Sequence, residues 1–273
     1  MRRLITILCL VLTIQSVTAQ LKSEATSETH SAEMRVNAGF TKKFKSSGVF
    51  INFNEEIRSR LYESTDGTLA NPAAYFRVSY TTVDLSYRPL PYLKVGAAYT
   101  LKLFGNKQMI DSRGDLNGLR HRVNIHANGS YETGQWKFSL RERLDINIRH
   151  DSVNVYEQPK TELRLKHRLG ALYSIPAQPV KVYTWCELVN TLNASTEYLN
   201  QQTGGNYGQY LSDVRAQLGV RWRLNRENTL DFAYRFSYGY DRDLNVTKNK
   251  QLIELTHEKS FMHVLSIAYE FEW

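Results

Sequence analysis

Apolar and polar residues alternate with a period of two along most of this chain. The closing stretch, LSIAYEFEW at 265–273, has Leu, Ile, Tyr, Phe and Trp at its odd positions and Ser, Ala and two Glu at its even ones. Successive side chains of a β-strand point to opposite faces, so this pattern predicts a strand with one apolar and one polar face. No comparable run has apolar residues spaced at 3.6, and helices are expected to be scarce.

The alternation predicts eleven strands and an all-β fold. The strands are expected at about 34–45, 48–61, 75–88, 92–104, 119–131, 135–149, 161–175, 179–189, 210–224, 228–240 and 260–273. Most are longer than the roughly 5–6 residues usual in a soluble sheet. In strand 75–88 the alternation changes phase between Tyr80 and Val83, as it would at a β-bulge.

The connections between these strands alternate in length. Short ones (KSSG, RPLP, ETGQ, IPAQP and LNREN) alternate with longer polar ones near 62–74, 105–118, 150–160, 190–209 and 241–259. Aromatic residues also gather near strand ends: Tyr210 and Trp222 lie twelve positions apart on one apolar face. These features favour a transmembrane up-and-down antiparallel β-barrel, with the apolar face toward lipid. A soluble lipocalin-like binding barrel, with apolar residues inside, shows the same alternation and is the alternative.

The number of strands is predicted as about 12, with 10 as the alternative. Eleven strands would start the first one on the outer side, whereas single-chain bacterial barrels usually have an even number. A further strand would lie within 21–33, or around Leu252 and Leu255. Three charges, Lys42, Glu55 and Glu142, fall on the nominal lipid face, and a bulge could turn Glu142 inward.

The two ends of the chain suggest export and barrel assembly. MRRLITILCLVLTIQSVTAQ combines two arginines, an apolar run and a small-residue cleavage site, which predicts a signal peptide at 1–19. A polar lead at 20–33 and an outer-membrane barrel at 34–273 would follow, in a Gram-negative bacterium. Removing 1–19 lowers the formal charge from +8 to +6 and leaves Cys186 as the single cysteine. Tyr269, Phe271 and Trp273 resemble the C-terminal signal read by the barrel-assembly machinery.

Several stretches resemble one family. VNAGFTKKFKSSGVFINFNEEIRSR, YLKVGAAYTLK, LRHRVNIHANGSY, WKFSLRERLD and VRWRLNRENTLDFAYRF are similar to members of DUF2490, a family of unknown function. The resemblance covers nearly the whole mature chain and rests on repeated patterns of alternating hairpins. It implies an exported outer-membrane barrel and supplies no catalytic residues.

The polar face carries a dense set of charges that would line the lumen. The sharpest cluster comprises Arg120, Arg122, Arg141, Arg143 and Arg164, with Asp145 and Glu162 as counter-charges. Paired with one another, these groups would form a structural network that largely closes the lumen. Arginines left unpaired would instead attract anions, since guanidinium forks suit carboxylate and phosphate. Both interpretations stay open.

The leading functional prediction is a non-enzymatic barrel for passive passage or binding of small polar or anionic solutes, or for a structural or surface-interaction role. Its expected partners are outer-membrane lipid, the assembly machinery and a small anionic solute, with a monomer as the default. Nucleic acid is not expected, because the basic residues alternate along strands. Arg149-His150-Asp151-Ser152 carries hydrolase residue types, but consecutive loop residues do not by spacing form a nucleophile–base pair. A rim hydrolase acting on lipid or peptide is therefore the alternative, and no cofactor or metal is expected.

Overall fold

The protein forms one closed β-barrel. The computed structural model describes residues 26–44, 46–71, 75–105, 118–149, 159–193, 209–246 and 252–273, and the predicted signal peptide lies outside them. The strands are β1 (Thr26–Phe44), β2 (Val49–Thr65), β3 (Thr68–Asn71), β4 (Tyr75–Leu90), β5 (Leu93–Phe104), β6 (Leu119–Thr133), β7 (Trp136–Arg149), β8 (Thr161–Ser174), β9 (Val180–Thr191), β10 (Tyr210–Arg223), β11 (Asn228–Val246) and β12 (Leu252–Glu272). The prediction of an all-β barrel with about 12 strands is confirmed. No helix capable of crossing a membrane occurs in the described ranges.

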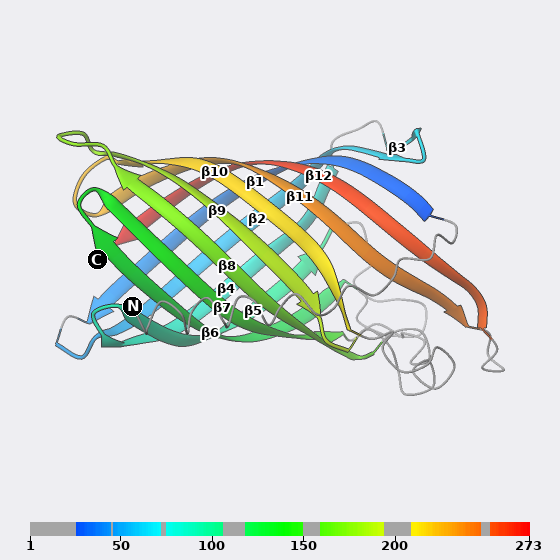
Figure 1. The fold of residues 1–273 in the computed structure, drawn as a ribbon, viewed down its shortest axis with the longest axis horizontal. Helices are drawn as coiled ribbons and strands as arrows, with labels where there is room; N and C mark the ends of the chain where they lie inside the picture. The colour runs from blue at the N-terminus through cyan, green and yellow to red at the C-terminus, as the bar shows by residue number, and fades with distance from the viewer. Residues whose placement is uncertain are drawn as a thin grey trace, which may run out of the picture.

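Eleven strands close the wall, and the short β3 is an extra strand that pairs only with β2. All neighbours in the wall are antiparallel except β1 and β12, which pair in parallel. The parallel seam follows from the odd number, because the first and last strands of an up-and-down barrel then run in the same direction. Figure 1 shows the tilted strands around one axis, with the short hairpin turns at the end on the left, where β12 also finishes.

The parallel seam makes a cross-linking prediction. Met34 lies opposite Leu265, and Ala38 lies opposite Tyr269. In a chain with Cys186 replaced by alanine, cysteine pairs at 34/265 and at 38/269 should both be joined by a short thiol cross-linker. The displaced pair 34/269 is the control and should not react. An antiparallel seam could not bring both aligned pairs together, so the reaction of only one would contradict this topology.

Strand boundaries differ from the predicted ones at the end of the barrel with the long connections. β1 begins at Thr26, so most of the predicted polar lead at 20–33 is part of the wall. Its inward residues are the buried Thr29, Ser31 and Glu33, while Glu28 and His30 point outward, which removes the apolar alternation. The predicted connection 241–259 is likewise mostly strand, because β11 and β12 extend into it.

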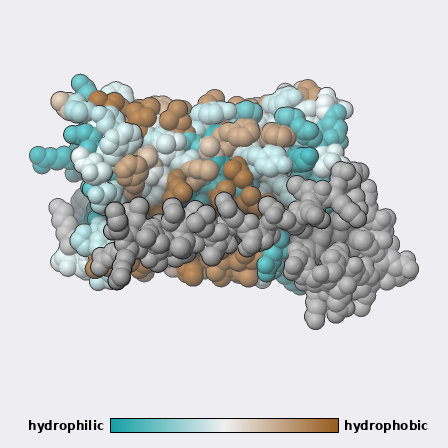
Figure 2. All heavy atoms as spheres, in the orientation of Figure 1, coloured by the Kyte–Doolittle hydropathy of each residue, from teal (hydrophilic) through white to brown (hydrophobic). Residues whose placement is uncertain are grey.

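The barrel is polar inside and apolar outside. Among the described residues, eighteen polar or charged side chains are buried and only seven hydrophobic ones are. Large apolar side chains instead stand on the outer wall; Leu218 is 59% exposed and Leu265 58%. Figure 2 shows hydrophobic side chains along the middle of the visible wall and hydrophilic ones toward its ends. A water-soluble domain has the opposite distribution.

The three charged residues on the outer wall each contact an aromatic or polar neighbour. Lys42 places its ammonium 2.8 Å from the ring centre of Trp273, and Glu55 accepts a 2.6 Å hydrogen bond from Thr81 Oγ1. Glu142 forms an ion pair with His167. The suggestion that a bulge turns Glu142 inward is wrong, because the pairing of β7 with β6 and β8 has no register shift.

The phase change expected between Tyr80 and Val83 does not occur either. Tyr80 points into the lumen, on the same face as Thr82. A register shift lies earlier in β4, where Val78 pairs with Arg58 but Phe76 pairs with the adjacent Ser59.

The last residues of the chain form the closing seam with β1. The Phe271 ring stacks on Phe40 with centroids 5.8 Å apart. The Trp273 amide donates to the Thr41 carbonyl at 2.8 Å, and the Trp273 carbonyl accepts from the Lys43 amide at 3.1 Å. Tyr269 stands on the same outer face. These residues have a structural role in closure; recognition by an assembly machinery stays a prediction.

Candidate functional site

Two cavities occupy the lumen. The larger is about 870 Å³ and the smaller about 490 Å³. Among the described residues, fifteen lysines and arginines and eight carboxylates line the larger one, a formal surplus of seven positive charges, and the buried Glu33 behind this lining pairs with Arg35 and Arg77. Both volumes fall in the range of small-molecule binding sites. The lumen thus has room for a solute and a field that favours anions.

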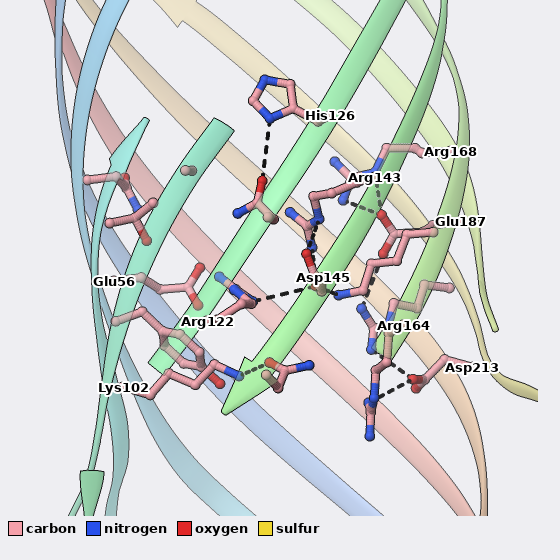
Figure 3. A pocket seen from close by; sticks show the side chains of 18 of the residues that line it. Glu56, Lys102, Arg122, His126, Arg143, Asp145, Arg164, Arg168, Glu187 and Asp213 are labelled. Atoms are coloured by element: carbon pink, nitrogen blue, oxygen red, sulfur yellow. Dashed lines mark hydrogen bonds and ion pairs between the residues drawn. The ribbon is translucent and has the colours of Figure 1, made fainter. Parts of the chain in front are cut away.

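Asp145 is the centre of the larger cavity's charge network (Figure 3). Its side chain is 1% exposed and lies 2.7 Å from the Lys166 ammonium and 2.9 Å from Arg143 Nε. Arg122 approaches it at 4.0 Å and also donates a 3.1 Å hydrogen bond to Thr100. One carboxylate therefore contacts three cations, and these contacts hold Arg122 and Arg143 in place.

Glu187 forms a second centre on β9. Arg168 donates to its Oε2 from Nη2 at 2.7 Å and from Nε at 2.9 Å, and Arg215 approaches Oε1 at 3.2 Å. Arg168 also stacks 4.1 Å over the ring of Trp185, which faces the lumen. These contacts hold the Arg168 guanidinium between a carboxylate and an aromatic face.

Glu162 and Asp213 hold Arg164. The Arg164 guanidinium lies 2.7 Å from Glu162 and 4.0 Å from Asp213, and Arg149 lies 3.9 Å from Glu162. Nearby, the Lys102 ammonium donates a 2.7 Å hydrogen bond to Asn147. The part of the lumen around Asp145, Glu187 and Glu162 is therefore a largely paired charge network. For this part, the structure agrees with the interpretation that the lumen charges pair with one another.

The five predicted arginines all line the larger cavity, but the structure divides them. Arg122, Arg143 and Arg164 are held by carboxylates, and Arg120 stacks 5.0 Å from the Phe104 ring. Arg141 differs from these four. No ion pair or hydrogen bond joins its guanidinium to any described residue.

A second arginine with the same property, Arg235, lies on β11. It also lines the lumen and forms no ion pair or hydrogen bond within the described residues. The alternation places Arg235 on the polar face, but sequence does not single it out from the other lumen arginines. Only the closed wall shows which cations find a carboxylate.

The register decides which lumen cations face one another across neighbouring strands. Arg141 and Arg143 lie opposite Asn128 and His126 on β6, so they do not face Arg120 and Arg122 directly. Like charges meet instead across β7 and β8, where Arg141 is opposite Arg168 and Arg143 is opposite Lys166. Asp145 forms ion pairs with Arg143 and Lys166, and Glu187 forms one with Arg168. Arg141 has no ion pair of this kind among the described residues.

Other predicted chemistry lies at the margins of the described structure. His150, Asp151 and Ser152 fall outside the described residues, so the rim-hydrolase alternative stays a prediction. Most of the connection 190–209 also lies outside the described residues. Cys186 is a free cysteine, exposed on the outer wall. Within the described ranges, no three His, Cys, Asp or Glu side chains converge as metal ligands would.

The fold and site define a β-barrel with an apolar outer wall and a cationic lumen. The chain belongs to the family of proteins of unknown function DUF2490, whose family model matches residues 34–248. This match confirms the resemblance seen in the sequence. A comparison with curated proteins gives no match.

Proposed function

We propose that the protein spans the outer membrane of a Gram-negative bacterium and that its lumen binds or passes small anions. The surplus of seven positive charges around the larger cavity carries this proposal. A lumen lined by one sign of charge concentrates ions of the other sign, because low-dielectric walls focus the field. The role is passive: the proposed barrel supplies a path or a binding chamber and no reaction.

The outer wall supports the membrane part of the proposal. Large apolar side chains cover it, and Trp136, Tyr87 and Trp222 stand near the short turns, where an aromatic belt would meet the lipid–water interface. Most of the buried residues in the described structure are polar or charged, whereas a soluble lipocalin-like barrel would have an apolar interior. The predicted signal peptide would direct the chain to this location.

Ion selectivity tests the passage part. In planar lipid bilayers under a tenfold KCl gradient, the barrel should give conductance steps whose reversal potential has the sign of chloride preference. Arg141→Glu combined with Arg235→Glu lowers the lining surplus from seven to three and should move the reversal potential toward zero. Cation preference in the parent barrel would contradict the proposal. A folded barrel that gives no steps would limit the role to binding or structure.

A further inference from the structure

The two cavities meet at a ring of residues that we call the waist: Asn54, Asn128, Arg141 and Arg235. All four line both the larger and the smaller cavity. They come from β2, β6, β7 and β11, which are not all neighbours in the wall. Closure of the barrel therefore brings to one level of the lumen groups that sequence leaves far apart.

The waist is distinguished by what its side chains lack. Arg141 and Arg235 have no ion pair within the described residues, and neither Asn54 nor Asn128 makes a side-chain hydrogen bond there. Asn37, which lines the smaller cavity, is also without a side-chain hydrogen bond in the described structure. Most other charges around the lumen are paired. Polar groups in such sites are normally satisfied by a partner, whether protein, water or ligand.

Three of the four remaining charged residues shared by the two cavities are already in ion pairs. Arg35 lies 2.5 Å from Glu33, Arg168 is held by Glu187, and Glu56 pairs with Arg58. Glu270 lies near the short-turn end of β12 and interacts electrostatically with Arg221, without an ion pair among the described residues. Within the described structure, the waist therefore presents two guanidiniums without an ion pair, and amides without a side-chain hydrogen bond, to the space between the cavities.

We propose that the waist is a binding site for a small polyhydroxylated anion, the chemistry of a phosphorylated sugar. Two guanidiniums, each a planar fork of donors, match an acid group. The amides of Asn37, Asn54 and Asn128 offer both donors and acceptors, as hydroxyl groups require. The smaller cavity, about 490 Å³ and lined also by Tyr183 and Trp185, has room for a sugar ring beside the waist.

This inference rests on the proposed function for access to the lumen, but binding is measured without any passage. The folded barrel in detergent is titrated calorimetrically with glucose 6-phosphate, inorganic phosphate and glucose. Glucose 6-phosphate should bind roughly tenfold more tightly than either fragment, since only it engages arginines and amides together. Calorimetry does not depend on conductance. A barrel that conducts anions but does not bind glucose 6-phosphate would therefore contradict the proposed binding site at the waist and leave the proposed function standing.

Variants assign the two halves of the site. Arg141→Ala and Arg235→Ala should each weaken glucose 6-phosphate binding by roughly tenfold. Asn128→Ala should weaken the sugar phosphate and leave phosphate unchanged. Arg223→Ala is the matched control, because Arg223 is exposed and lines neither cavity. Heat-modifiable gel mobility confirms that each variant is folded.

Three outcomes would overturn the proposal. The first is absence of glucose 6-phosphate binding to the folded parent barrel. The second is equal affinity for phosphate and glucose 6-phosphate, which would show that the lumen senses charge alone. The third is a loss of glucose 6-phosphate affinity in Arg223→Ala as large as the loss in Arg141→Ala. That result would mean that the overall positive charge of the barrel, and not the waist, governs binding.

Discussion

Asp145→Asn should lower the free energy of unfolding by about 3–5 kcal/mol, the usual cost of removing one partner from a buried ion pair. The substitution keeps the shape of the side chain but leaves Lys166, Arg143 and Arg122 without their carboxylate. Asp145 is 1% exposed, so little water is available to replace the lost charge. Urea unfolding of the barrel in lipid vesicles, followed by tryptophan fluorescence, measures the change.

Arg141→Gln is the contrasting variant. It also removes one lumen charge, but that charge has no ion-pair partner among the described residues. Stability should therefore stay within about 0.5 kcal/mol, because the half-buried guanidinium has no ion-pair partner to lose. If Arg141→Gln lowered the free energy of unfolding as much as Asp145→Asn does, the division between a paired charge network and an unpaired waist would be wrong.

A double variant isolates the ion pair itself. Lys166→Met alone should destabilise the barrel, because it leaves Asp145 with two weaker partners. Combined with Asp145→Asn, it should cost less than the sum of the two single changes, since residues in contact couple by about 0.5–3 kcal/mol. Additive losses would indicate that the 2.7 Å contact contributes nothing specific.

Leu218→Arg should destabilise the protein in lipid vesicles by about 2–4 kcal/mol, if the outer wall faces hydrocarbon. Leu218 lies on β10, five residues from the short-turn end of that strand, and is 59% exposed. A charged side chain placed at mid-depth in a bilayer has no water or counter-charge within reach. Urea unfolding in vesicles gives the free energy directly.

Leu224→Arg provides the matched control. Leu224 is 44% exposed and lies just beyond the end of β10, where an arginine can reach water at the rim. The same substitution should therefore cost only about 0–1 kcal/mol. In a protein surrounded by water, both substitutions replace an exposed leucine and both should be nearly neutral. Equal small effects in vesicles would contradict the membrane placement.

These predictions concern features that sequence identifies to different degrees. The alternation identifies Leu218 as outward and Asp145 as inward, because the period of a strand is two whatever its neighbours are. The partners of Asp145 are a different matter. Lys166 is twenty-one residues away, and it reaches Asp145 only because β7 and β8 pair in the observed register.

The strand count shows the same limit. Period-two runs locate nearly all of the wall, but β3 lies within a predicted connection and the polar start of β1 has no apolar face to reveal it. Closing the wall with eleven strands depends on whether β1 can pair in parallel with β12. The residues of β1 and β12 that pair are more than two hundred positions apart in the sequence. Nothing in the local sequence of either strand indicates that they form hydrogen bonds with each other.

By itself, the sequence determined the class of fold, the face that most residues take, and the cationic character of the lumen. These are local properties, set by alternation, turn residues and charge. The tertiary structure alone decided the parallel seam, the pairing of Glu142 with His167, and the separation of Arg141 and Arg235 from the paired network. Each of these depends on which strands meet across the barrel, and that is set by closure and register of the whole wall.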